Sequence, residues 1–303
     1  MPPPSQDREL QCVTAALYEL DPKGSRTAQV LRDTLDQLYD GQRTGRYRWD
    51  QLFKTEKTHC GTLVEINLQR EFKFENGGKL DYRIAGIEVD CKYSQTRCAW
   101  MIPPEAHDHL CLVLCAEDSQ NPTWSMGLVR ATVDHLNTGA NRDAKSTLNE
   151  AGRKAINWLF EEAPLPPNVL LQLPQAALDR IMAMNSGVQK TNELFRVALG
   201  MRVGRAVVAT VSEQVDYMRR IRYNGGARGY LQPEGIIILG QYQSHVAVAR
   251  SLGLPLPGLG ESVSARIPPA RVAGPGAAEI EGKLWRIAKS GDPIVPAPIL
   301  PEI

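Results

Sequence analysis

The segment Leu80–Lys92 alternates apolar and polar residues on both sides of the dipeptide Ala85-Gly86. A two-residue turn at this dipeptide would make the segment a β-hairpin in which Ile84 faces Ile87. Because strand side chains alternate between the two faces, one face would be apolar and carry Tyr82, Ile84, Ile87, Val89 and Cys91. The other face would be charged and carry Asp81, Arg83, Glu88, Asp90 and Lys92. The pattern predicts two paired strands with a single apolar face.

Two aspartates, Asp81 and Asp90, fall opposite each other in this hairpin. Their Cβ atoms would lie about 5 Å apart, a distance at which like charges repel unless a cation lies between them. Mg²⁺ would supply that charge, since it binds oxygen ligands and often needs only one or two carboxylates. Lys92 follows on the same face, where its ammonium could orient a water or stabilise charge on a phosphate. Glu65, on a preceding helix, could complete the acidic cluster. The alternative to a metal site is that this strand face is solvated and simply carries charges of both signs.

The surrounding sequence predicts a mixed sheet with helices beside it, an α/β (α+β) fold. Residues 9–39 are expected to form two helices around a turn at 21–24, and residues 55–72 a further helix. Strands are expected at 110–116 and 124–133, and a helix at 149–160. We expect this first domain to span residues 1–160.

A proline-containing segment at 161–170 is predicted to be a linker to a second domain, residues 171–303. Its expected helices are 174–184, 191–199, 213–223 and 244–252, and its expected strands are 206–211, 235–239 and 262–267. Short helices with short hairpin strands are typical of a helix-turn-helix or winged-helix DNA-binding domain. The tail from Pro268 is rich in Pro, Gly and Ala and is expected to be partly irregular.

Basic residues are distributed unevenly although the net charge is only +1. Residues 171–303 contain 15 Lys and Arg against 10 Asp and Glu, nearly all of the basic ones being arginine, which suits forked contacts to phosphate and guanine. We expect DNA contacts in this domain from Arg219, Arg220, Arg222 and Arg228. In the first domain, Arg97 and Arg142 lie on loops that could reach a DNA groove. The alternative is that these are ordinary surface arginines.

The remaining composition excludes several classes of protein. The first residues, MPPPS, lack the basic and apolar blocks of a signal peptide, and we find no apolar run long enough to cross a bilayer. We therefore expect a cytoplasmic protein. All six cysteines lie within the first 115 residues without a C-x-x-C pair, which predicts buried reduced thiols.

The stretch LYDGQR, residues 38–43, resembles the K-x-D-G-x-R signature of DNA ligases, with Leu38 in place of the nucleophilic lysine. A leucine cannot act as a nucleophile, so ligation is excluded. We interpret Leu38 as a core residue of a helix that Asp40-Gly41 ends. A relic of strand-joining chemistry, or a DNA-backbone contact through Arg43 and Arg46, stays open.

The spacing of Glu65, Asp81 and Asp90-Cys91-Lys92 resembles that of the PD-(D/E)-x-K nucleases, except that Leu80 replaces the usual proline. Longer stretches, including KTEKTHCGTLVEINLQREF, IAGIEVDCK and LQPEGIIILG, are similar to type IIE restriction endonucleases of the NaeI family from about residue 9 to 296.

This resemblance implies a restriction-endonuclease-like domain followed by a topoisomerase-like domain with a helix-turn-helix. It implies a Mg²⁺-dependent homodimer that cuts a short palindrome such as GCCGGC while a second DNA site acts as effector. A cognate DNA methyltransferase is also expected. Carried over by position, Glu65, Asp81, Asp90 and Lys92 are catalytic, and Asp81, Asp90, Glu65 and the Cys91 carbonyl bind the metal. The alternatives are a nicking endonuclease of the mismatch-repair type and a non-catalytic DNA-binding regulator.

Overall fold

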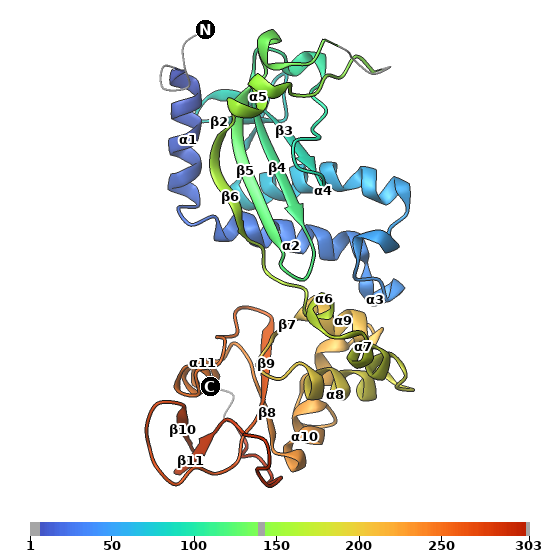
Figure 1. The fold of residues 1–303 in the computed structure, drawn as a ribbon, viewed down its shortest axis with the longest axis vertical. Helices are drawn as coiled ribbons and strands as arrows, with labels where there is room; N and C mark the ends of the chain where they lie inside the picture. The colour runs from blue at the N-terminus through green and yellow to red at the C-terminus, as the bar shows by residue number, and fades with distance from the viewer. Residues whose placement is uncertain (1–6, 139–142, 301–303) are drawn as a thin grey trace. The chain divides into compact units, whose positions relative to one another are not determined.

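A computed structural model describes residues 7–138 and 143–300 of the chain (Figure 1). Contacts divide the chain into two compact units. Unit 1 comprises Met1–Leu38 and Leu52–Pro167, and unit 2 comprises Tyr39–Gln51 and Asn168–Ile303. The segment 161–170, which we expected to be a linker, contains the end of one strand and the beginning of one helix.

Unit 1 is built on a six-stranded mixed sheet whose strands follow the order of the chain. They are β1 (Glu75–Asn76), β2 (Tyr82–Ile84), β3 (Ile87–Ser94), β4 (Leu110–Glu117), β5 (Thr123–Arg130) and β6 (Asn157–Pro164). Only the pair β3–β4 is parallel, and the other neighbours are antiparallel. The predicted mixed sheet is confirmed.

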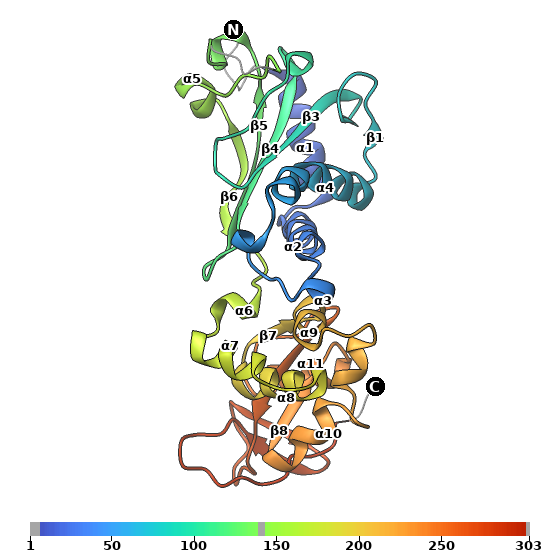
Figure 2. The same ribbon diagram turned by 90° about the vertical axis from the view of Figure 1, so that its right-hand side faces the viewer.

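Helices and loops cover the sheet of unit 1. Its α-helices are α1 (Arg8–Leu20), α2 (Ser25–Tyr39), α4 (Lys54–Phe72) and α5 (Glu150–Lys154). Figure 2 shows α1, α2 and α4 beside the sheet. Alternate residues of β4 pack in an apolar cluster against loop residues such as Trp100 and Ile102. These residues of β4 are Cys111, Val113 and Cys115. Residues 110–116 are therefore buried throughout, as expected for a strand packed on both faces.

The predicted hairpin is confirmed, with Ile84 opposite Ile87 and Tyr82 opposite Val89. Ala85 and Gly86 both have positive φ, 50° and 77°, which is the requirement of a type I′ turn. The apolar face is largely buried, since Tyr82 and Val89 are fully covered. The local alternation of residues was sufficient to fix this register.

The prediction for residues 149–160 is wrong in its second half. The helix α5 ends at Lys154, and residues from Asn157 onward form the strand β6 on β5. The aromatic residues Trp158 and Phe160 favour a strand, and pairing with β5 satisfies the backbone groups that a longer helix would have satisfied.

Unit 2 consists of short helices around small sheets. Its α-helices are α3 (Gly41–Thr44), α6 (Val169–Gln172), α7 (Gln175–Met182), α8 (Gly187–Val197), α9 (Arg205–Ser212), α10 (Ala227–Leu231) and α11 (Gln243–Ser251). A three-stranded sheet has the order β7 (Arg202–Gly204), β9 (Glu261–Arg266), β8 (Ile236–Leu239). The tail contains a hairpin of β10 (Ala277–Ile280) and β11 (Lys283–Arg286).

Two predictions in unit 2 are wrong. The apolar run 206–211 is the helix α9 instead of a strand, and it is buried from Val207 to Ser212. A short continuous apolar run does not distinguish a buried strand from a buried helix. The helix predicted at 213–223 is replaced by a turn and a 3₁₀ segment, Tyr217–Ile221, because Glu213 adopts a left-handed conformation that ends α9.

The interpretation of Leu38 as a core residue is confirmed, since Leu38 is buried together with Leu31 and Leu35. The helix α2 ends at Tyr39, and Asp40 adopts a left-handed conformation with φ 47°. The following Gly41 is buried against α9, where an added Cβ would lie 2.0 Å from Thr210 Oγ1 and 2.8 Å from the Arg46 carbonyl oxygen.

Gly41→Ala should therefore destabilise the protein by about 1–3 kcal/mol, because the methyl group overpacks the contact between α3 and α9. Urea unfolding measures this change. Gly274→Ala is the matched control, since an added Cβ at Gly274 meets no atom within 4 Å. Equal stability of the two variants would contradict the packing argument.

Candidate active site

Three side chains of β3 point to the same side of the sheet. They are Glu88, Asp90 and Lys92, spaced two residues apart. Contacts from this side reach the loop before β2, through Glu88, and Asp81, through Lys92. Asp81 lies directly before β2, and its Oδ2 accepts a hydrogen bond of 2.7 Å from the backbone nitrogen of Cys91. The ladder of β2 and β3 ends at Tyr82 opposite Val89, so the expected pairing of Asp81 with Asp90 lies outside it. Asp81 contacts β3 through this side-chain hydrogen bond instead.

The ammonium of Lys92 lies among three oxygen atoms. Its Nζ is 2.7 Å from Asp90 Oδ2 and 3.6 Å from Asp81 Oδ2, and it donates a hydrogen bond of 2.9 Å to the Cys91 carbonyl oxygen. We call these three atoms the oxygen cluster. The sequence predicts a positive charge between the two aspartates of this hairpin. In this structure the charge is supplied by the protein itself.

Burial and charge oppose each other in the cluster. Asp90 is only 3% exposed, and this burial raises the pKa of its carboxyl group, while the ammonium of Lys92 opposes the rise. For Lys92, burial acts to lower the pKa, but the hydrogen bond and charge of Asp90 together with the charge of Asp81 outweigh it, so that the pKa is raised. The thiol of Cys111, on β4, lies 3.9 Å from Asp90 Oδ2 and is a further weak donor to it.

Glu65 approaches the cluster from α4. The hydroxyl of Tyr82 donates a hydrogen bond of 2.6 Å to the Glu65 carbonyl oxygen, which ties α4 to β2. Burial raises the pKa of the Glu65 carboxyl, and the charge of Asp81 raises it further while Lys92 lowers it. The charges of Asp81 and Lys92 therefore act on Glu65, and its membership of the catalytic set stays a prediction.

The oxygen cluster fits a divalent cation of the magnesium type. Within residues 7–138 and 143–300, no group of three or more His, Cys, Asp or Glu side chains is arranged to hold a metal. Mg²⁺, however, commonly uses one or two carboxylates and keeps several waters. The ammonium of Lys92 stands where such a cation would be attracted, and its three contacts are all to oxygen atoms.

The arginines predicted to contact DNA differ in their surroundings. Arg97 forms ion pairs with Glu161 and with Glu162, the latter at 2.7 Å, and its guanidinium lies 4.9 Å from the centroid of the Trp158 ring. Arg43 is 83% exposed, with Nη1 3.8 Å from Asp40 Oδ2. Both Arg43 and Arg46 belong to unit 2 by their contacts. Arg142 lies outside the described residues.

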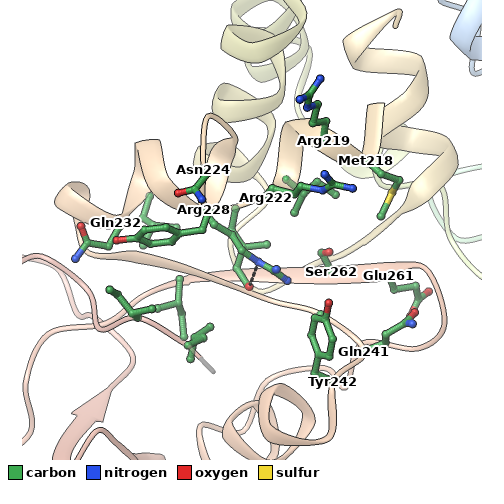
Figure 3. A pocket seen from close by; sticks show the side chains of 18 of the residues that line it. Met218, Arg219, Arg222, Asn224, Arg228, Gln232, Gln241, Tyr242, Glu261 and Ser262 are labelled. Carbon is green, nitrogen blue, oxygen red and sulfur yellow. Dashed lines mark hydrogen bonds between the residues drawn. The ribbon is translucent and has the colours of Figure 1, made fainter. Parts of the chain in front are cut away.

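A pocket of about 740 Å³ in unit 2 brings together three of the other predicted arginines, Arg219, Arg222 and Arg228. Figure 3 shows Arg222 and Arg228 across the pocket from Gln241 and Tyr242. Arg228 Nε donates a hydrogen bond of 3.1 Å to the Ile238 carbonyl oxygen.

The other predicted residue of this region, Arg220, does not line the pocket. Sequence reasoning did not find Gln241 and Tyr242, because they follow β8 in the chain and belong to no motif.

The six-stranded mixed sheet of unit 1 and the helices beside it are consistent with a restriction-endonuclease-like fold. The family model described as restriction endonuclease NaeI matches residues 11–296. The chain is 52% identical over 304 residues to the type II restriction enzyme NaeI of Lentzea aerocolonigenes, covering 98% of this chain and 95% of that protein. The chain therefore belongs to the NaeI family of restriction endonucleases.

Membership of this family makes the protein a type II site-specific deoxyribonuclease that acts on double-stranded DNA. It favours the restriction-endonuclease prediction over a nicking repair enzyme and over a non-catalytic regulator. Among residues 7–138 and 143–300, none of the helices combines the length and apolar character needed to span a membrane.

Proposed function

We propose that the protein is a Mg²⁺-dependent restriction endonuclease that makes double-strand cuts at a short palindromic, GC-rich site of the GCCGGC type. The observation that carries this proposal is the convergence of Asp81, Asp90 and the Cys91 carbonyl on a single positive charge. Oxygen atoms of this kind, beside a lysine, suit the hydrolysis of a phosphodiester bond.

In this proposal Asp81, Asp90 and the Cys91 carbonyl hold Mg²⁺, and Glu65 supports it or its water. When bound, the ion supplies Lewis-acid polarisation of the scissile phosphate and lowers the pKa of water. The ammonium of Lys92 contacts the same oxygens and would turn toward the phosphate if they held the ion. There it would help to position or deprotonate the attacking water and would stabilise negative charge, and in-line attack would leave a 5′-phosphate and a 3′-hydroxyl.

A second part of the proposal concerns DNA recognition. A palindromic site requires a homodimer with two-fold symmetry. We propose that unit 2, whose pocket gathers Arg219, Arg222 and Arg228, binds a second copy of the site as effector through a helix-turn-helix or winged-helix arrangement. Arg43, Arg46 and Arg220 are proposed to contact the DNA backbone, and Arg97 and Arg142 to reach a DNA groove. A cognate methyltransferase is proposed to protect the host DNA.

Digestion of sequenced plasmids tests the reaction. With Mg²⁺ we expect linear product whose ends map within a GC-rich palindrome, and with EDTA we expect no product. A plasmid with one site should be cut slowly, and an added oligonucleotide duplex carrying the site should accelerate the cutting. Accumulation of singly nicked circles as the end product would instead support the repair-type alternative.

Asp90→Ala and Lys92→Ala should each reduce cleavage by roughly 100-fold or more, because the first removes a proposed ligand of Mg²⁺ and the second removes the ammonium that stabilises negative charge in the transition state. Binding of the DNA site, measured in Ca²⁺ by gel shift, should persist. Lys154→Ala is the control, since its ion pair with Glu150 is exposed and contributes little. Normal cutting by either active-site variant would refute the assignment.

Arg222→Ala should weaken DNA binding by unit 2 and reduce the salt dependence of affinity by about one unit of slope, as expected for the loss of one phosphate contact. Arg250→Ala removes the same charge from an exposed position outside the pocket. We expect this control to retain the original slope. Identical salt dependence in both variants would argue against the pocket as a DNA contact.

A further inference from the structure

The loop before Asp81 is folded around the carboxylate of Glu88. Glu88 Oε1 accepts a hydrogen bond of 2.8 Å from the backbone nitrogen of Gly78, and Oε2 accepts bonds of 3.1 and 3.0 Å from those of Lys79 and Leu80. Three successive amides therefore point at one carboxylate, an arrangement that otherwise binds free anions. Arg83 adds a contact of 3.1 Å to Oε1.

The folded loop leads directly to the active site. The last of the three amides belongs to Leu80, and the next residue is Asp81, whose carboxylate accepts the hydrogen bond from the Cys91 nitrogen. The loop is closed on its other side by a hydrogen bond of 3.3 Å from the Gly77 nitrogen to the Asp81 carbonyl oxygen. Asp81 is thus fixed at its backbone by the loop and at its side chain by β3.

The shape of the loop leaves little freedom. A Cβ added at Gly77 would lie 2.0 Å from the Leu80 carbonyl oxygen, so only glycine fits there without moving the backbone. Leu80 itself is buried in the apolar cluster with Trp100 and Ile102. Hydrogen bonds to an ionised carboxylate are about twice as strong as neutral ones. Glu88 therefore holds the three amides in one arrangement.

We propose that Glu88 is a positioning residue for the nuclease reaction, and that it acts by holding the loop 77–80 so that Asp81 is placed in the oxygen cluster. This inference rests on the proposed function of Asp81 as a metal ligand. Glu88 shares its strand face with Asp90 and Lys92. The strand β3 therefore carries both the residue that holds the loop 77–80 and two residues of the proposed catalytic set. The carboxylate of Glu88 is occupied by the amides and does not touch the reacting atoms.

Glu88→Gln tests the proposal because the amide has the same size but presents N–H groups where one carboxylate oxygen accepted hydrogen bonds. We expect the Mg²⁺ concentration for half-maximal cleavage to rise about 10- to 100-fold, the usual effect of losing a group that orients a metal ligand. In the metal-free protein, hydrogen exchange at the amides of residues 78–80 should accelerate while the central strands stay protected. Arg83→Ala, which leaves the three backbone bonds intact, should behave as the wild type in both measurements.

Gly77→Ala provides a second route to the same displacement with Glu88 unchanged, and it keeps the test open if Glu88→Gln does not fold. It should give the same raised Mg²⁺ requirement. The inference is overturned if either folded variant shows accelerated exchange at residues 78–80 but a normal Mg²⁺ dependence. It is also overturned if the amides of Glu88→Gln remain protected.

Asp81→Asn separates this inference from the proposed function. If Asp81→Asn is inactive and Glu88→Gln is normal, Asp81 keeps its role and only the positioning role of Glu88 is lost. If Asp81→Asn cuts normally, the proposed metal site itself is wrong.

Discussion

The ion pair between Lys92 and Asp90 is the interaction on which the candidate active site depends. An ionised carboxylate that is almost completely buried costs several kcal/mol unless a partner compensates the loss of water. Lys92 provides that partner at 2.7 Å, and it lies at the same time within 3.6 Å of Asp81. Two like charges can therefore remain close together in the folded protein.

The strand β3 can carry this cluster because of its place in the sheet. It pairs with β2 on one side and with the buried strand β4 on the other, so its backbone is held along both edges. A strand held in this way fixes its side chains more closely than a loop would, and small displacements of reacting groups reduce rates strongly. The loop before β2 lacks such pairing, and the carboxylate of Glu88 replaces it.

The parts of the structure that were predictable from sequence are those governed by short-range patterns. The alternation around Ala85-Gly86 gave the hairpin register, and the helix spacing gave α1, α2 and α4. The helix α9 was not predictable, because its apolar residues suit both a helix and a strand and only distant partners select one. The strand β6 was missed because the expected helix extended through Trp158 and Phe160, although aromatic residues favour a strand. The role of Glu88 was also hidden. In the sequence, Glu88 is indistinguishable from the other charged residues of a polar strand face. Its three amide partners are identified only in the folded loop.

The assignment of Tyr39–Gln51 to unit 2 has a consequence for the order of folding. Gln42 donates a hydrogen bond to the Gln214 carbonyl oxygen across 172 positions of sequence, and Gly41 packs on Thr210. Closing so long a loop in an unfolded chain carries a large entropic cost. Residues 52–167 of unit 1 lie within that loop, so their collapse shortens the distance that must be closed. During synthesis, α3 leaves the ribosome long before α9, so unit 2 can complete its own packing only after residues 52–167 of unit 1 have been synthesised.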